Sequence, residues 1–297
     1  MKKVLVFGQD LIEENKIYCD DLFTKLQEEG IEIYLYEKFF HALQKFKVEI
    51  QHNGIISSYE EVVEINPEFV ITLGGDGTIL NAVTLVRDTG IPIIGINLGR
   101  LGFLAIGEKT SIGDLIDDLM QGHYKLEKRS LLSLDSNTSL FGNANIALND
   151  FTIHKYASSS VVVIHTYVDD NYLNSYWADG LIVATPTGST GYSMSCGGPI
   201  VLPGSGNFVI TPVAPHHLTI RPIVIPDTSV ITFRIEGRSD NFLCTLDARY
   251  KPITSKHKLS VRKAEYSINL VVLEGRDFIR NIYNKLHWGK DSRKITH

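Results

Sequence analysis

The sequence predicts an α/β N-terminal domain with a mostly parallel, Rossmann-like sheet, followed by an all-β C-terminal domain of the β-sandwich type. Up to about residue 120, short apolar runs alternate with segments of helical spacing. Beyond about residue 125, nearly every apolar run is short, rich in Val, Ile, Thr and Phe, and bounded by turn residues. The 297 residues fit two domains at roughly 150 residues each. We therefore expect domains at residues 1–125 and 126–275.

The composition is that of a globular protein and excludes several other classes of protein. Hydrophobic residues make up 43% and charged residues 21%, which excludes wholesale disorder. The formal net charge of −5 offers no polybasic surface for nucleic acid. Cys19, Cys196 and Cys244 lie far apart, which argues against a disulfide scaffold or structural zinc and suits a reducing cytoplasm. The first apolar run, Val4–Phe7, is too short for a signal peptide, and no run approaches the roughly 18 residues of a membrane span. We expect a soluble, cytoplasmic protein.

The first region reads as alternating strands and helices. Gly30 is a plausible helix C-cap, and Thr110 or Ser111 a plausible N-cap. Strands are expected at residues 4–7, 31–36, 68–73 and 91–97, and helices at residues 17–29, 79–87 and 111–120. This order predicts ligand binding at the carboxyl ends of the parallel strands.

The second region reads as a series of short strands. Asp169-Asp170-Asn171 is expected to form a hairpin turn between two of them. Strands are expected at residues 131–135, 151–155, 161–168, 172–176, 181–185, 208–213, 230–235, 242–246, 259–262 and 268–273. A helical pattern returns at residues 278–286.

The strongest functional signal is Gly74-Gly75-Asp76-Gly77-Thr78, between a strand and a helix. Glycines there bring main-chain N–H groups close to an anion, and the helix N-terminus adds positive potential. The segment is neither a Walker A loop nor a dinucleotide fingerprint, because the Gly-Lys-Ser/Thr and the third glycine are missing. A carboxylate among phosphates would hold a metal ion or accept a proton from an attacking hydroxyl. The alternative is an Asp-Gly turn with a helix N-cap.

A second signal is the hydroxyl-rich segment 185–195, directly after a strand. Short hydroxyls and bare amides suit phosphate and ribose recognition, and Tyr192 offers a ring for a base or a nicotinamide. The segment is one residue short of a nucleophile elbow. Cys196 reads better as a small buried thiol than as a nucleophile. The alternative is an ordinary Ser/Thr-rich loop.

Three weaker signals complete the set. Asn149-Asp150 precedes a strand and reads as either a turn or a polar binding pair. As an acceptor-only anion at neutral pH, Asp150 would suit hydroxyl or amino donors. Asp179 would bind a ribose hydroxyl or make a turn. His216-His217 lacks a partner cluster at metal-ligand spacing and reads as structural.

In this order, these segments resemble the NAD kinase (ATP-NAD kinase) family. The likeness runs from about residue 68 to the C-terminus and weakens between residues 38 and 66. It is carried by residues 74–78, 97–104, 148–150, 179–193, 197–200 and 212–222. The first motif also occurs in lipid kinases, but its combination with the hydroxyl-rich segment is highly specific.

The resemblance implies transfer of the terminal phosphate of ATP, or of polyphosphate, to the 2′-hydroxyl of the adenosine ribose of NAD. Asp76 would be the proton acceptor, and Gly74, Gly75, Gly77 and Thr78 the phosphate loop. Mg²⁺ would bridge the phosphates, and the chain would form a homodimer or homotetramer. The tail, residues 276–297, would return to the first domain, and the active site would lie between the domains. The NAD-binding residues would be Asp76, Gly77, Asn81, Asn149, Asp150, Trp177, Asp179, Thr190, Gly191, Tyr192, Ser193, Met194, Ser195, Ala214 and Arg249.

Three residues depart from the family pattern. They are Asp150, where Glu is commoner, Trp177, where many members are polar or basic, and Ser160, where an arginine is frequent. They bear on the choice between NAD and NADH. The phosphate clamp has only candidates: Arg100, Lys155 and Arg221. Two alternative functions stay open, a kinase for a lipid or another small alcohol and a dinucleotide-binding regulator without catalysis.

Overall fold

The computed structural model describes residues 1–99, 102–105, 107–156, 161–237, 240–275 and 277–287. The chain divides into two compact units. The first unit comprises Met1–Lys128 and the chain from Ile268 onward, and the second is Arg129–Ser267. The unit boundaries fall inside two long strands, β7 (Tyr124–Ser136) and β18 (Leu259–Leu273). The second boundary therefore lies earlier in the chain than residue 275, where the strand pattern ends.

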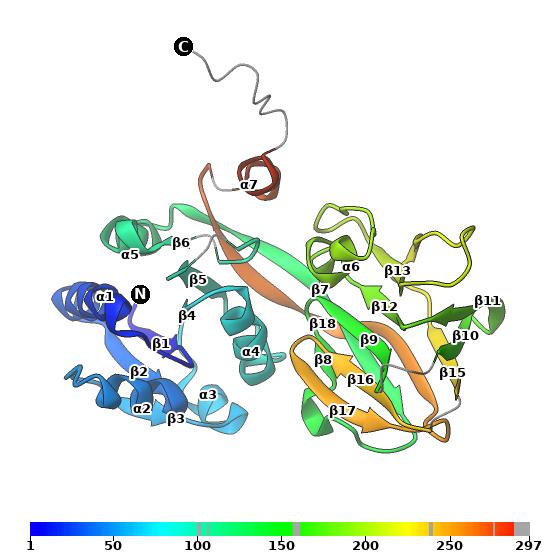
Figure 1. Cartoon of the computed structure of the whole chain (residues 1–297). Helices are drawn as coiled ribbons and strands as arrows, with labels where there is room; N and C mark the ends of the chain where they lie inside the picture. Colours follow the sequence, from blue (N-terminus) through cyan, green and yellow to red (C-terminus); the bar gives the residue numbers. More distant parts are fainter. Residues whose placement is uncertain (100–101, 106, 157–160, 238–239, 276, 288–297) are drawn as a thin grey trace, which may run out of the picture. The chain divides into compact units, whose positions relative to one another are not determined.

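The first unit is built on a parallel sheet in the order β3-β2-β1-β4-β5, whose strands lie side by side in Figure 1. The predicted α/β class is confirmed. The sheet grows outward in both directions from β1 and β4, so the strand order reverses between these two neighbours. Ligands bind outside the carboxyl ends of the strands at such a point. The strands are β1 (Lys3–Phe7), β2 (Glu32–Tyr36), β3 (Gly54–Ile56), β4 (Phe69–Leu73) and β5 (Ile93–Asn97).

Helices bury apolar faces against this sheet. Three of them share one core cluster with alternate sheet residues, including Val4, Val6 and Ile71. These helices are α1 (Lys16–Glu28), α2 (Glu37–Lys45) and α5 (Ile112–Gln121). The other two, α3 (Tyr59–Ile65) and α4 (Asp76–Val86), pack against each other, and α4 also contacts β4 and β5. The helices at 17–29, 79–87 and 111–120 were predicted, whereas α2, α3 and β3 were not.

The second unit holds two antiparallel sheets with one apolar core between them. One has the order β14-β13-β12-β9-β16-β17, and the other runs β11-β10-β15-β18. Phe151 of the first sheet stacks on Phe233 of the second, with ring centroids 5.2 Å apart. The strands of the first sheet are β14 (Ile223–Pro226), β13 (Asn207–Val213), β12 (Gly180–Ala184), β9 (Asp150–Lys155), β16 (Phe242–Leu246) and β17 (Arg249–Ile253). Those of the second are β11 (Asn171–Ala178), β10 (Val162–Val168) and β15 (Ile231–Gly237), with β18.

Two details of the second unit test the sequence patterns. Asp169 and Asp170 both have positive φ, 49° and 63°, as a type I′ hairpin turn requires, and β10 pairs with β11 around them. That turn prediction is confirmed. The strands expected at 259–262 and 268–273 are instead one continuous strand, β18, because the polar residues between them face outward without interrupting the ladder. β14 and β17 were not predicted.

Short elements complete the fold. They are β6 (Gly107–Glu108), β8 (Ile146–Ala147), α6 (Tyr192–Ser195) and single 3₁₀ turns at Glu13–Asn15, Lys109–Ser111, Gly142–Ala144 and Gly188–Thr190. The predicted C-terminal helix is present as α7 (Phe278–Leu286), which begins after Asp277, whose carboxylate accepts the N–H of Arg280. None of the helices in the described ranges is long and apolar enough to cross a membrane.

The close approach of α4 to β5 gives a stability prediction. A Cβ on Gly95 would lie 2.5 Å from Ile79 Cδ1 and 2.8 Å from Ala105 Cα, so Gly95→Ala should lower the free energy of unfolding by about 1–3 kcal/mol. Gly113, exposed on α5, has no atom within 4 Å of its Cβ position, and Gly113→Ala should raise stability by up to about 1 kcal/mol. Urea unfolding of both variants measures this. Equal changes in the free energy of unfolding for the two variants would mean that packing at Gly95 is looser than the structure shows.

Candidate functional site

The glycine loop follows β4 and leads directly into α4. Gly74 has a φ of +150°, and a Cβ there would lie 2.2 Å from Thr78 Oγ1, so a side chain cannot be placed without strain. In contrast, a Cβ at Gly75 or Gly77 would meet nothing within 4 Å. Packing does not require glycine at these two positions. They leave open space above the helix N-terminus, where main-chain N–H groups favour an anion.

Asp76, the first residue of α4, holds a neighbouring segment with its carboxylate. Its Oδ2 accepts the N–H of Phe103 at 2.8 Å, and its Oδ1 accepts those of Leu104 and Ala105 at 3.0 and 3.1 Å. A Cβ on Gly102 would lie 1.8 Å from Asp76 Oδ1. The helix N-cap is Gly75, without a side-chain cap. The alternative of Asp76 as an N-cap is therefore wrong, and the carboxylate is fixed in place by three donors.

The C-terminal helix supports the same segment, as the resemblance implied for the tail. Asn281 Nδ2 lies 3.4 Å from the carbonyl oxygen of Phe103, and Lys285 Nζ lies 3.9 Å from the centroid of the Phe103 ring. Burial lowers the pKa of Lys285, and the charge of Asp76 opposes that effect. Asn281 and Lys285 were not predicted from the sequence, because a helical pattern alone does not tell which loop the helix covers.

Asn81, also on α4, bonds to the first turn of its own helix and to the loop after β1. Its Nδ2 donates to the carbonyl oxygen of Gly77 at 2.8 Å and lies 3.3 Å from Gln9 Oε1. The loop after β1 is thus joined to the first turns of α4 through one amide. Asn81 as a contact of NAD stays a prediction.

In the second unit, Asp247 organises the Asn149-Asp150 pair. Its carboxylate accepts the N–H groups of Leu148, Asn149 and Asp150 at 2.9, 2.8 and 3.1 Å. Asp247 itself has a φ of +52°, an uncommon conformation for a residue with a side chain. Asp247 was not predicted as a site residue, because in the sequence it looks like any turn residue between two strands.

The pair that Asp247 holds has unusual polar groups. Asn149 Oδ1 is buried without a hydrogen-bond partner among the described residues. Asp150 is 7% exposed, and burial, with the charge of Asp247, raises its pKa to about 7. The expectation that Asp150 is fully ionised at neutral pH is therefore corrected. An unpaired acceptor and a carboxyl group that titrates near neutrality both favour a ligand that donates hydrogen bonds.

The hydroxyl-rich segment lies against this pair. A Cβ on Gly188 would lie 1.9 Å from the carbonyl oxygen of Asn149, and one on Gly191 would lie 3.7 Å from Asn149 Nδ2. Thr185 Oγ1 donates to the carbonyl oxygen of Leu148 at 2.6 Å. The structure thus brings together two segments that the sequence separates by about 35 residues.

Most hydroxyls of this segment bond within the protein. Thr190 Oγ1 donates to the carbonyl oxygen of Thr187, and Ser193 Oγ pairs with Thr211 Oγ1 at 2.8 Å. Ser189 Oγ bonds to Pro186 and to Val201. In this conformation these side chains shape the loop, and contacts of Thr190, Gly191 and Ser193 to NAD stay predictions. Met194 is half-buried and Ser195 exposed at the loop surface.

Aromatic and charged groups surround the loop. Tyr192, 42% exposed, stacks on His154 at 5.5 Å, and burial lowers the pKa of His154. Lys155 Nζ lies 2.6 Å from Asp179 Oδ1. Trp177 is 49% exposed. Tyr192 and Trp177 as contacts of a base or nicotinamide ring stay predictions.

Several predicted residues have other contacts. The Arg249 guanidinium donates to the carbonyl oxygens of Ala144 and Ile146, and Arg221 Nη1 donates to the carbonyl oxygen of Leu218 at 2.6 Å. With Lys155 paired to Asp179, neither Lys155 nor Arg221 presents an unengaged phosphate clamp. Ala214 has a φ of +45°, a strained position that accompanies functional loops. Arg100 and Ser160 lie outside the described residues.

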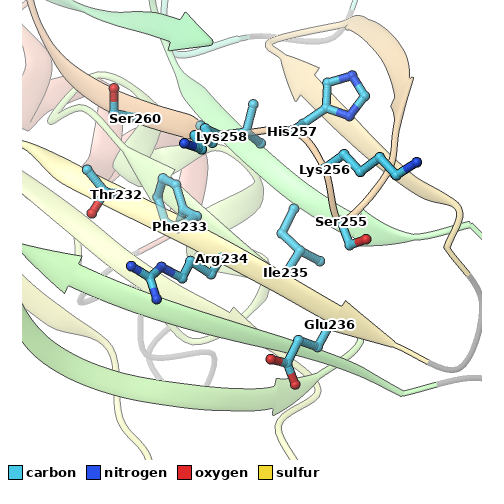
Figure 2. A pocket seen from close by; sticks show the side chains of 11 residues that line it. Thr232, Phe233, Arg234, Ile235, Glu236, Ser255, Lys256, His257, Lys258 and Ser260 are labelled. Atoms are coloured by element: carbon cyan, nitrogen blue, oxygen red, sulfur yellow. The ribbon is translucent and has the colours of Figure 1, made fainter. Parts of the chain in front are cut away.

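The remaining candidate residues do not gather into a metal site in the described part of the chain. In the described part of the chain, no three His, Cys, Asp or Glu side chains gather closely enough to hold a metal ion. His216 and His217 are exposed, and Cys196 is half-buried. A cavity of about 730 Å³ lies beside β15 and the start of β18, where Arg234, Glu236 and Lys256 point in different directions (Figure 2). None of the predicted site residues lines it.

The raised pKa of Asp150 makes stability depend on pH. Between the ordinary value of 3.8 and about 7, the folded protein keeps this proton while the unfolded chain has lost it, so stability falls as pH rises through this range. From pH 5 to pH 8 the loss should be on the order of 2 kcal/mol, and Asp150→Asn should abolish it. Urea unfolding at both pH values measures this, with Asp170→Asn in the exposed β10–β11 turn as the control. Equal pH dependence in Asp150→Asn and the unmodified protein would contradict the assignment.

Comparison with known proteins identifies the family of the chain. Residues 4–124 match the family model of the ATP-NAD kinase N-terminal domain, and residues 148–273 match that of the ATP-NAD kinase C-terminal domain. The NAD kinase of Cytophaga hutchinsonii is 43% identical over 96% of this chain and 98% of its own length. That of Flavobacterium psychrophilum is 41% identical over 98% of this chain and 99% of its own.

Solved structures show the same fold. The structure of yeast NADH kinase complexed with NADH aligns with a TM-score of 0.86 at 22% identity, over 98% of this chain and 89% of that one. An NAD kinase from Archaeoglobus fulgidus in complex with ATP aligns with a TM-score of 0.73 at 23% identity, over 97% and 99%. The resemblance found in the sequence is confirmed: the chain belongs to the ATP-NAD kinase family and carries both of its domains.

Proposed function

We propose that the chain transfers the terminal phosphate of ATP to the 2′-hydroxyl of the adenosine ribose of NAD. The observation that carries this is the Asp76 carboxylate, fixed by three main-chain donors at the start of a helix whose glycine loop is open to an anion. Phosphoryl transfer needs alignment and charge stabilisation more than covalent help from the protein. The glycine loop would supply the charge stabilisation, and Asp76 would supply the alignment.

Asp76 is proposed as the group that orients and deprotonates the ribose hydroxyl. A carboxylate has about four acceptor positions on its two oxygens. Two N–H groups occupy Oδ1 and one occupies Oδ2, so Oδ2 retains an acceptor position for the substrate hydroxyl. The three donors fix the direction of that lone pair before the substrate arrives.

Recognition of NAD is proposed for the second unit. The unpartnered Asn149 Oδ1 suits the amino group of adenine, and Asp150 suits a ribose hydroxyl or the same amino group. The exposed Tyr192 ring offers a stacking surface for a base. The Asp179, Trp177, Ala214 and Arg249 contacts proposed from the resemblance would extend this pocket.

A divalent cation, Mg²⁺, is proposed as part of the ATP substrate. Both Asp76 oxygens already accept main-chain N–H groups, and the described side chains build no separate cation site. The cation would thus take its ligands mainly from the phosphates, where it neutralises their charge. Assembly into a homodimer or homotetramer and a cytoplasmic location are also proposed from the family resemblance.

The competing functions have less support. A lipid kinase should offer an apolar slot for its acceptor, whereas the groups beside the hydroxyl-rich segment are an amide, two carboxyl groups and a phenol. The relatives that match along nearly the whole chain are named NAD kinase. A regulator without catalysis would have no need of the fixed carboxylate at Asp76.

The role of Asp76 is tested by two variants. Asp76→Asn replaces one acceptor oxygen with an amide and should lower kcat for NADP formation by about 10² or more, with little change in NAD affinity by calorimetry. Gly102→Ala keeps the carboxylate but displaces it, since the new Cβ would lie 1.8 Å from Oδ1, and should lower kcat similarly. Near-normal kcat in Asp76→Asn would reduce Asp76 to a structural residue.

The role of Asp150 is tested by its effect on one substrate. Loss of a charged acceptor for a ligand hydroxyl costs about 1.5–3 kcal/mol, so Asp150→Ala should raise the KM for NAD about tenfold or more and leave that for ATP nearly unchanged. The ionised carboxylate of Asp150 would accept a hydrogen bond from NAD. The KM for NAD should therefore fall as pH rises through about 7 in the unmodified protein. A parallel rise of both KM values would show that Asp150 supports the fold only.

A further inference from the structure

Two of the three predicted clamp residues bond elsewhere in the structure, and the third, Arg100, lies outside the described residues. Lys155 is paired with Asp179, and Arg221 donates to a main-chain carbonyl oxygen. The helix N-terminus at the glycine loop contributes only partial charge. A triphosphate carries several full negative charges, so further cations should lie near this loop.

We infer that a cavity between the loop after β1 and helix α2, lined by Lys38, His41 and Lys45, binds the phosphate chain of the donor. This rests on the proposed function, in which ATP or polyphosphate is the donor. The cavity has a volume of about 510 Å³, within the roughly 300–1,000 Å³ typical of small-molecule sites. Gln9, Asp10 and Phe46 also line it.

Its place in the sheet puts the cavity beside the glycine loop. β1 and β4 are parallel neighbours with Phe7 opposite Thr72, so the loops that follow them leave the same edge of the sheet side by side. This is where the strand order reverses, the usual position of ligands in such sheets. The amide of Asn81 joins Gln9, which lines the cavity, to the start of α4, where it also donates to the carbonyl oxygen of Gly77.

Helix α2 forms the other wall. The end of β1 lies directly against it, since a Cβ on Gly8 would be 2.3 Å from the Phe39 ring. Lys38, His41 and Lys45 follow at i, i+3 and i+7, which places them on one face of the helix. That all three line one cavity agrees with this spacing.

The charges of this face have no role in the fold that the structure shows. No carboxylate lies within 4.0 Å of Lys38 or Lys45 Nζ in the described ranges, and Lys45 Nζ lies 5.9 Å from the centroid of the Phe46 ring. Lys38 stands in the first turn of α2, where the helix dipole disfavours a cation. Asp10 is the one acid among the residues that line the cavity. With two cations and an imidazole against one carboxylate, the lining of this cavity favours the binding of an anion.

The double variant Lys38→Ala/Lys45→Ala tests the assignment in the whole chain. The KM for ATP should rise at least tenfold, and the KM for NAD should change less than twofold. Lys125→Ala/Lys128→Ala removes two exposed lysines of β7 in the same unit and should leave both KM values unchanged. Lys38→Arg/Lys45→Arg should retain most of the ATP affinity. Equal rises in both KM values, or no rise for ATP, would overturn the assignment.

Calorimetry with inorganic tripolyphosphate tests the cavity apart from the reaction. The unmodified protein should bind tripolyphosphate, and Lys38→Ala/Lys45→Ala should weaken that binding at least tenfold, whether or not the protein makes NADP. If tripolyphosphate does not bind while ATP does, recognition lies in the nucleoside and the assignment fails. Absence of NADP formation with intact tripolyphosphate binding would overturn the proposed function and keep the cavity as a phosphate site.

Discussion

In each unit, a carboxylate accepts three successive main-chain N–H groups, and both candidate sites depend on this arrangement. Asp76 holds residues 103–105 in the first unit, and Asp247 holds residues 148–150 in the second. Charge-assisted bonds of this kind are about twice as strong as neutral ones. Each therefore fixes a short segment of main chain, and in the second unit that segment leads directly into β9.

The two carboxylates differ in what they leave available. Asp76 keeps an acceptor position on Oδ2 and lies next to a glycine loop with open space above it. Asp247 instead holds the main chain of residues 148–150, and burial, with the charge of Asp247, raises the pKa of Asp150. The same device thus positions a reactive group in one unit and tunes a binding group in the other.

The sequence predicted what depends on local pattern. The parallel sheet, the all-β second region, the Asp169-Asp170 turn and the last helix followed from periodicity and turn chemistry. Helix α3 was missed although Ser58 and Glu61 form a capping box, a signal readable from spacing alone. Asp247 and Lys285 could not be found in this way. Their roles come from contacts with residues about 100 and 180 positions away, and no local pattern encodes such a contact.

The continuity of β18 has a consequence for the order of events during synthesis. The second unit is one uninterrupted stretch of chain, whereas the first needs residues from both ends. Strand β5 pairs with Leu270 of β18, and the segment held by Asp76 contacts α7, so both wait for the last part of the chain. Domains generally form as they emerge from the ribosome. Here the unit whose translation begins first completes its structure after the second unit, and a nascent chain cannot hold Asp76 in its final surroundings until α7 has been synthesised.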